Sequence, residues 1–356
     1  MNHPANYENN EMSTQIPPEE GRGTFSFSTR INIPKSSLEI GYQDRILTLG
    51  SCFAENIGTK LQDAYFLSFI NPFGVLYNPL SVGQGVRHLL SEQEFTAADL
   101  FQYGSLWNSF AHSSIFSATT PDETLQKINS RLVAARYFLS ETSVMMITLG
   151  TAWIFENIET GKTVSNCHKL PADRFNRRRV SVDEIVTELS EIIEQLRHRN
   201  PKLQFIFTIS PIRHWKDGAH ENTLSKSTLH MAVDELDKKF SFVHYFPSYE
   251  IVMDELRDYR FYAADMIHPS PVAVDFIWDK FKTTLFGKAD LELSREITQV
   301  KKAMEHRPLN SVSAEYRQFL ENSLRTISLL VKNHPVLDFS AEIHYFSKQI
   351  ENGSEK

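Results

Sequence analysis

The chain has only two cysteines among its 356 residues, Cys52 and Cys167, and they are far apart in the sequence. Without a Cys-x-x-Cys pair, neither a zinc site nor a redox dithiol is indicated, and we expect both thiols to stay reduced. A long basic run is also missing, and the net charge is −7. We therefore expect neither nucleic acid nor an anionic membrane surface as a partner.

Long apolar stretches are absent as well. No segment reaches the ~18 uninterrupted apolar residues that a membrane span needs, and the first twenty residues lack the apolar core of a secretory signal. These absences predict a cytoplasmic protein. Hydrophobic residues make up 41% of the chain and charged residues 23%, as in ordinary globular proteins, so we expect most of the chain to fold around a sizeable core.

Apolar runs that alternate with amphipathic segments indicate the fold class. Helices are predicted over 181–196, where Ser181 and Glu184 have capping-box spacing, and over about 222–239. Five short apolar runs are typical of strands covered on both faces, and they span 46–49, 65–70, 144–150, 203–209 and 242–246. This alternation predicts an α/β fold with a doubly wound, mostly parallel five-stranded sheet.

The chain divides into three predicted regions. Residues 1–24 are polar and aperiodic, which is typical of a disordered arm. Residues 25–287 hold the α/β domain, and the interval of about 71–142 is too long for one crossover, so we expect an inserted subdomain or a lid there. Residues 288–356 are amphipathic and rich in helix formers, which predicts a helical extension. A homodimer through these helices is one possible assembly.

The turn that starts at Gly50 follows the first predicted strand and precedes a helix. Ligands bind at this edge of doubly wound sheets. A hydroxyl at Ser51 would be exposed there, next to the positive end of the helix, which stabilises an oxyanion. Two alternatives remain at this point: Ser51 is an ordinary helix cap, or the neighbouring Cys52 thiol is the nucleophile rather than a packing residue.

Asp265 and His268 lie three residues apart before the last helix of the α/β domain. This spacing allows the carboxylate to accept a hydrogen bond from imidazole Nδ1, which leaves Nε2 free to take a proton from a hydroxyl. An Asp-x-x-His sequence alone is common and usually structural. Its place after five strands that begin with a strand-turn serine favours the catalytic interpretation.

The string GSCFAENIG at 50–58 resembles the signature of the GSCFA family, a branch of the SGNH (GDSL-like) hydrolases. The resemblance covers roughly 46–286 and includes further strings at 71–79 (NPFGVLYNP), 149–152 (LGTA), 167–169 (CHK), 210–214 (SPIRH) and 265–269 (DMIHP). It implies an SGNH-like sheet with flavodoxin-like strand order. It also implies Ser51 as nucleophile, His268 as general base and then acid, and Asp265 as the residue that orients His268.

The same resemblance implies an oxyanion hole formed by the backbone N–H groups of Ser51 and Gly74. The sequence departs from the SGNH pattern in the third block, where an asparagine side chain normally donates, because Gly150 is followed here by Thr151 rather than by an amide. The Thr151 hydroxyl is one replacement donor. Asn71 or Asn78, from the preceding loop, are the others.

Loops at the ends of strands line the binding site in such folds. Asn78, His168, Arg213 and His214 therefore become candidate substrate-binding residues, although a structural role is the more common one for each. Taken together, these features predict a serine esterase that forms an acyl-Ser51 intermediate on a carbohydrate or small-molecule ester, without metal or organic cofactor. The alternatives are an acyltransferase with the same triad and an inactive binding module of the same fold.

Overall fold

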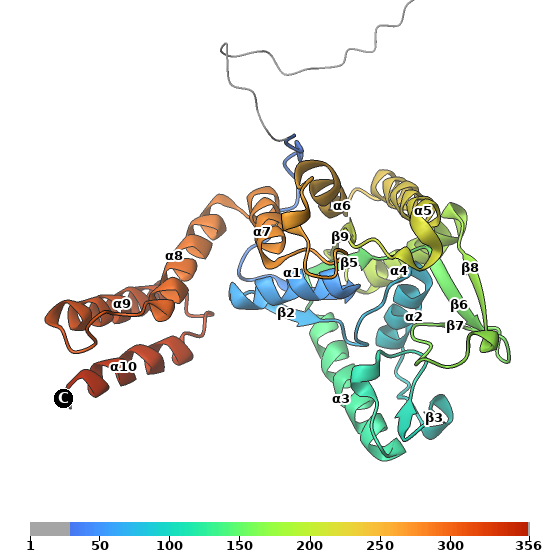
Figure 1. Ribbon diagram of the computed structural model, residues 1–356, viewed down its shortest axis with the longest axis horizontal. Helices are drawn as coiled ribbons and strands as arrows, with labels where there is room; N and C mark the ends of the chain where they lie inside the picture. Colours follow the sequence, from blue (N-terminus) through green and yellow to red (C-terminus); the bar gives the residue numbers. More distant parts are fainter. Residues whose placement is uncertain (1–28, 355–356) are drawn as a thin grey trace, which may run out of the picture.

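The structure is a computed structural model that describes residues 29–354, so the predicted arm at 1–24 lies outside the described residues. A five-stranded parallel sheet forms its centre (Figure 1). The strand order is β10-β9-β5-β1-β2, which confirms the predicted doubly wound α/β fold. The strands are β1 (Arg45–Gly50), β2 (Leu67–Ile70), β5 (Val144–Leu149), β9 (Gln204–Ile209) and β10 (Val243–Phe246).

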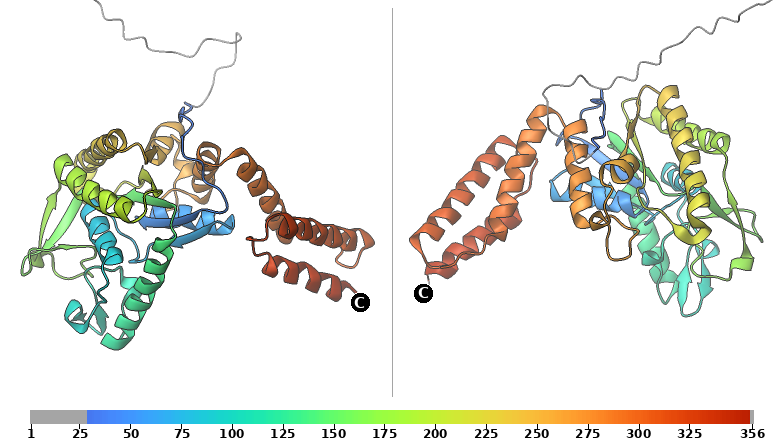
Figure 2. Two further views of the ribbon diagram at one scale, coloured as in Figure 1. Left: turned by 180° about the vertical axis from the view of Figure 1, so that it is seen from behind. Right: turned by 45° about the horizontal axis from the view of Figure 1, so that its top comes forward.

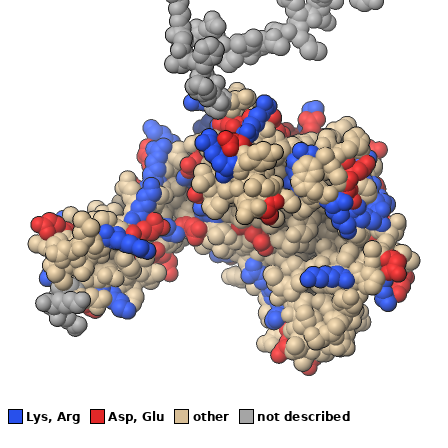
Figure 3. Space-filling view, in the orientation of Figure 1, with Lys and Arg blue, Asp and Glu red and all other residues tan. Residues whose placement is uncertain are grey.

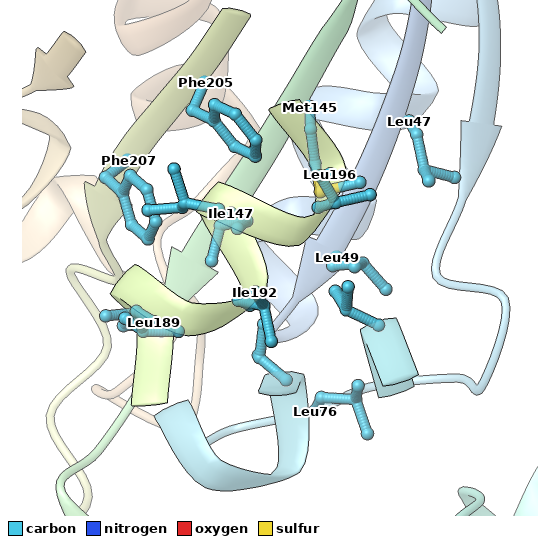
Figure 4. Packing of buried hydrophobic residues seen from close by; sticks show 14 of the residues in the cluster. Leu47, Leu49, Leu76, Met145, Ile147, Leu189, Ile192, Leu196, Phe205 and Phe207 are labelled. Carbon is cyan, nitrogen blue, oxygen red and sulfur yellow. The ribbon is translucent and has the colours of Figure 1, made fainter. Parts of the chain in front are cut away.

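Helices cover both faces of the sheet because side chains alternate along each strand. Leu47 and Leu49 of β1 point into a core built with β5, β9 and α4 (Figure 4), whereas Ile46 points into the opposite core. The first face carries α2 (Pro79–Leu90), α3 (Pro121–Ser140), α4 (Val182–Arg199) and α5 (Gly218–Lys239). The second carries α1 (Cys52–Asp63), α7 (Pro271–Leu285) and the π-helical segment Ile251–Glu255 that follows the short α6 (Ser248–Glu250).

The capping box predicted for α4 is present. Ser181 Oγ accepts a hydrogen bond from Glu184 N–H, and the Glu184 carboxylate accepts one from Ser181 N–H. Two otherwise unpaired backbone donors are satisfied in this way, which fixes the start of the helix.

The interval 71–142, where an insertion was expected, contains two helices and a hairpin. Its two helices, α2 and α3, pack into the main core, and between them lies a hairpin of β3 (Phe101–Tyr103) and β4 (Leu106–Asn108). A second small sheet was not predicted. It has the antiparallel order β7-β6-β8 and consists of β6 (Trp153–Asn157), β7 (Thr163–Val164) and β8 (Phe175–Arg179).

The predicted C-terminal helices are present as α8 (Lys288–Glu305), α9 (Ala314–Asn333) and α10 (Ser340–Ser354). They extend to one side of the α/β body (Figure 2). The Tyr65 and Phe339 rings, with centroids 4.9 Å apart, join the end of α1 to the start of α10. Within the described range, none of the helices is both long and apolar enough to span a membrane.

Candidate active site

Ser51 is placed by the turn between β1 and α1. Gly50 has φ +139°, and a Cβ atom there would lie 2.2 Å from the Thr148 carbonyl oxygen, so only glycine fits this turn. Ser51 then caps α1, because its Oγ accepts a hydrogen bond from Phe53 N–H at 3.3 Å. The residue is only 1% exposed. The capping role and a nucleophilic role are thus compatible at the same position.

Asp265 and His268 form the pair that their spacing predicts. His268 Nδ1 lies 2.6 Å from Asp265 Oδ2, and Asp265 Oδ1 accepts hydrogen bonds from the backbone N–H groups of His268 and Ile267. These hydrogen bonds lower the pKa of the Asp265 carboxyl to about 2. Since the carboxylate is ionised at neutral pH, it accepts the hydrogen of Nδ1, and the neutral form of the ring then has Nε2 as its acceptor.

Ser51 and His268 lie at the same edge of the sheet. Ser51 precedes α1 and His268 lies two residues before Ser270, the N-cap of α7; both helices start at the carboxyl ends of the strands and pack together on one face. The charge of His268 also contributes to a lowered pKa of His214, which lies at this edge. No hydrogen bond joins Ser51 to His268 among the residues that the structure describes.

The three predicted oxyanion donors all have partners within the protein. The Ser51 N–H donates to the Thr148 carbonyl at 3.2 Å, and the Gly74 N–H donates to the Asn71 carbonyl at 2.9 Å. The Thr151 hydroxyl lies 3.1 Å from Ser225 Oγ. The structure therefore does not present these three groups as free donors, because each completes a local turn, ladder or side-chain hydrogen bond.

Asn71 has a side-chain donor without a partner beside the Ser51 turn. Its Oδ1 accepts a hydrogen bond from the Gly50 N–H at 2.9 Å, which holds the side chain against the turn that carries Ser51. Its Nδ2 is buried and has no hydrogen-bond partner within the described chain. Asn71 also has φ +41°, a conformation that asparagine tolerates better than most residues. A buried N–H₂ group without an acceptor is costly, which favours a functional role.

A cavity of about 780 Å³ opens beside this edge. Tyr77 and Thr151 line it, and the Tyr77 carbonyl accepts hydrogen bonds from the N–H groups of Gly150 and Thr151. Gly150 lies directly against Ser51, since a Cβ on Gly150 would be 3.5 Å from Ser51 Cβ. Glu55, one turn after Ser51, also lines the cavity. The cavity is therefore adjacent to the candidate nucleophile.

Two of the four predicted substrate-binding residues line this cavity. His214 does so, with its ring edge-on to Tyr77 at 5.8 Å between centroids. Burial lowers the pKa of His214, and the charges of Lys226 and His268 lower it further, which favours a neutral imidazole. Asn78 also lines the cavity, but its side chain caps α2, with Oδ1 accepting from Ser81 N–H and Nδ2 donating to Ser81 Oγ.

The other two predicted substrate-binding residues have structural contacts instead, and neither is among the described residues that line the cavity. His168 is buried, with Nε2 2.8 Å from the Ser109 carbonyl oxygen, so it holds its loop in place. Arg213 donates to Asn222 and Thr223 of α5. Position in a loop could not tell the two residues that line the cavity from the two that do not, since all four follow strand ends or turns.

The Cys52 thiol is poorly suited as a nucleophile. Burial raises its pKa, and the nearby Glu55 carboxylate raises it further. These effects outweigh the helix N-terminus and suppress the thiolate that thiol catalysis requires.

Lys226 is a residue of this site that the sequence interpretation missed. It lies on α5, is 2% exposed, and its Nζ donates to the carbonyl oxygens of Gly150 at 2.7 Å and Ser210 at 2.6 Å. It thereby joins the loops that follow β5 and β9. Lys226 lies three residues before Leu229 and seven before Val233, so it falls on the apolar face of α5. A lysine at such a position is the sequence feature that could have indicated a buried charge.

Burial lowers the pKa of Lys226 to about 7. Between about pH 7 and 10 the unfolded chain therefore binds a proton at this position that the folded protein lacks, so this group makes stability rise with pH. Replacing Lys226 with methionine should remove that rise. The unfolding free energy of wild type minus that of Lys226→Met should therefore grow by roughly 1.4 kcal/mol per pH unit from pH 7.5 to 9.5. Urea denaturation at several pH values measures this difference.

The exposed Lys202→Met change is the matched control for this experiment and should show no pH-dependent difference from wild type. If Lys226→Met changed the unfolding free energy by the same amount at pH 7.5 and at pH 9.5, the folded protein would keep the proton on Lys226.

The family model described as the GSCFA family matches residues 45–281, which run from the start of β1 into the last turns of α7. The chain belongs to the GSCFA family. A second model, the C-terminal domain of GSCFA domain proteins, matches residues 297–352 of this GSCFA protein, which cover most of α8–α10. The model boundaries thus follow the division between the α/β body and the helical extension.

Two solved structures are similar to this GSCFA protein over much of its length. One is an acetyl xylan esterase, Est2A, from the rumen bacterium Butyrivibrio proteoclasticus, at 14% identity and TM-score 0.33; the match covers 71% of this chain but only 65% of that one. The other is a carbohydrate esterase family 3 protein from Talaromyces cellulolyticus, at 9% identity and TM-score 0.30, covering 72% and 99%. No curated protein sequence matches the chain.

Proposed function

We propose that this GSCFA protein is a serine ester hydrolase with Ser51, His268 and Asp265 as its triad. The observation that carries the proposal is the 2.6 Å contact between His268 Nδ1 and Asp265 Oδ2, at the edge of the sheet where Ser51 begins α1. The ionised carboxylate fixes the imidazole tautomer that can act as a base. Helix α1 points its N-terminus, with its partial positive charge, toward the reacting oxygen atoms.

The proposed reaction has two balanced stages. His268 Nε2 takes the proton of Ser51 Oγ as the oxygen attacks the ester carbonyl, and then gives that proton to the departing alcohol, leaving acyl-Ser51. A water molecule next attacks the acyl carbon while His268 takes its proton. The proton returns to Ser51 Oγ as the carboxylic acid leaves.

Two features of the site require movement before the first stage. Ser51 is 1% exposed, whereas the side chains of Asp265 and His268 are about half exposed on the loop before α7. We infer that substrate binding opens the surroundings of Ser51 and brings this loop toward it. Asn71 Nδ2 then donates to the oxyanion, in place of the asparagine that SGNH hydrolases carry after the third strand.

The alcohol part of the ester would occupy the cavity beside Ser51. Its volume of about 780 Å³ and its mixture of aromatic and polar side chains, including Trp153, Phe155 and Asn166, suit a sugar better than a simple alkyl alcohol. We therefore propose a carbohydrate ester as substrate. The cytoplasmic location and the dimer through α8–α10 stay predictions.

Acyl transfer is the second candidate function, and the low exposure of Ser51 favours it. An acyl group on a serine that is 1% exposed would be shielded from water, so a sugar hydroxyl in the cavity could compete for it. The ratio of free acid to acylated sugar, measured with an added sugar acceptor, separates hydrolysis from transfer.

Covalent labelling tests the proposed function directly. A fluorophosphonate probe should phosphonylate Ser51, because only a serine that is activated by a base reacts quickly with it. Peptide mass spectrometry should find the label on the peptide that contains Ser51 and on its hydroxyl. The His268→Ala variant should lose the labelling. Label on Cys52, or none on an otherwise folded wild-type protein, would contradict the serine hydrolase and favour the thiol enzyme or the inactive binding module.

A further inference from the structure

The cavity beside Ser51 has two chemically different ends. Tyr77, Thr151 and His214 form the end that adjoins the reacting groups. The outer wall is formed by β6 and β8 of the small sheet and by the loops around Lys169 and Lys216. A ligand that reacts at Ser51 and fills the cavity must therefore contact this outer wall.

The outer wall carries unpaired positive charge. Arg177 is neutralised by a two-bond ion pair with Asp217, and its guanidinium lies 4.4 Å from the centre of the Trp153 ring. Lys169 and Lys216 line the same wall and are exposed, and neither forms an ion pair within the described chain. Lys216 Nζ lies 5.1 Å from the centre of the Phe155 ring.

The surface around the small sheet is rich in basic residues, of which the arginines of β8 are paired with carboxylates. Lys and Arg gather on the side of the molecule where β8 lies (Figure 3). The hydrogen bond from Arg177 lowers the pKa of the Asp217 carboxyl, and the positive charges of Arg177 and Lys216 lower it further. A positive wall in a chain with net charge −7 is a local feature, not a consequence of overall composition.

The backbone at Lys169 has an unfavourable conformation. His168 and Lys169 have φ +48° and +59°, and two successive residues with side chains rarely adopt this left-handed conformation. The loop is fixed by the His168 ring at the Ser109 carbonyl, by His168 N–H donating to Asn166 Oδ1, and by Leu170 N–H donating to the Cys167 carbonyl. Strain of this kind gathers at ligand sites, where it positions a side chain in advance.

We propose that the alcohol part of the ester carries an anionic group, which Lys169 and Lys216 bind at the outer wall of the cavity. The ligand class is an acylated sugar with a carboxylate or a phosphate. The ester group would face Ser51, the sugar ring would lie along the aromatic lining, and the anion would sit between the two ammonium groups. Only the ester part of this ligand rests on the proposed function. The anionic part rests on Lys169 and Lys216, which take no part in the proposed reaction.

Binding to the full-length Ser51→Ala variant tests the proposal without turnover. Two probes are anionic at neutral pH: the methyl glycoside of 2,3,4-tri-O-acetyl-glucuronic acid, with a free carboxylate, and methyl 2,3,4-tri-O-acetyl-glucoside 6-phosphate. The third is the neutral methyl 2,3,4-tri-O-acetyl-glucoside. Titration calorimetry at low salt should show about tenfold tighter binding of at least one anionic sugar than of the neutral one. The preference should shrink at 0.5 M NaCl. The tighter of the two anionic probes identifies the group.

Adding Lys169→Gln and Lys216→Gln to this variant should abolish the preference and leave binding of the neutral sugar unchanged. Adding Lys202→Gln and Lys332→Gln, two exposed lysines that do not line the cavity, removes the same charge and should preserve the preference. Equal affinities for all three sugars, no measurable binding, or a preference that survives loss of Lys169 and Lys216 would each overturn the proposal.

The failure of this proposal is distinguishable from failure of the proposed function. If the fluorophosphonate labels Ser51 but the sugars bind equally, the anion site alone is wrong. If Ser51 is not labelled but the lysine-dependent preference is found, the cavity binds an anionic sugar in a protein that is not a serine hydrolase.

Discussion

Replacing Ser51 with alanine is expected to lower kcat/KM for p-nitrophenyl acetate by at least about 10³-fold, and replacing His268 with alanine should have a similar effect. The first change removes the attacking oxygen, and the second removes the base that activates it. Because the two groups act in one step, the double variant should be no worse than either single variant. Release of p-nitrophenolate, followed by absorbance, measures all three.

Cys52→Ala is the matched control for this series, since it alters the adjacent residue on the same turn and removes the competing nucleophile. Its rate should stay within about threefold of wild type. If Cys52→Ala lost activity while Ser51→Ala kept it, the thiol would be the nucleophile. Equal rates in all variants would remove Ser51 and His268 from the reaction.

Replacing Asn71 with aspartate should lower kcat by about 10²- to 10³-fold, with a smaller change in KM. The aspartate keeps an oxygen at the position that accepts the Gly50 N–H, so the nucleophile turn should stay folded. It replaces the unpartnered Nδ2 donor with an oxygen that repels the developing oxyanion. Steady-state kinetics with p-nitrophenyl acetate measures kcat and KM separately, and thermal unfolding checks that the fold is intact.

Asn200→Asp provides the same chemical change away from the site, because the Asn200 Nδ2 donates to the Thr142 carbonyl before β5. It should leave kcat near the wild-type value. An Asn71→Asp protein with normal kcat would show that Asn71 is not an oxyanion donor, and the stabilising groups would then have to come from backbone N–H groups released during substrate binding.

The main sheet was predictable because its three central strands, β1, β5 and β9, are almost completely buried. In the run 144–149 five of the six residues are apolar and all six are buried, a pattern that an exposed element does not need. The capping box at Ser181 and Glu184 was readable for a similar reason, since its hydrogen bonds form within one helical turn. Contacts between residues that are close in the chain can be recognised from a short sequence pattern.

The small sheet was not predictable in the same way. Strand β8 has the sequence FNRRR, which reads as a charged loop. Its pairing with β6 supplies the backbone hydrogen bonds, and its arginines find Glu156, Asp217 and Glu221 as partners. None of these contacts is local. The wall of the cavity that this sheet forms was therefore invisible to pattern analysis.

The sequence by itself determined the α/β class, the turn at Gly50 and Ser51, and the hydrogen-bonded pair of Asp265 and His268, because each depends on neighbouring residues or on apolar periodicity. Only the tertiary structure decided that the expected oxyanion donors are already paired, that Asn71 and Lys226 lie at the end of the sheet, and that Lys169 and Lys216 share one wall. Those facts depend on which atoms meet across segments distant in the chain, and on which buried polar groups are left without a partner once the core has closed.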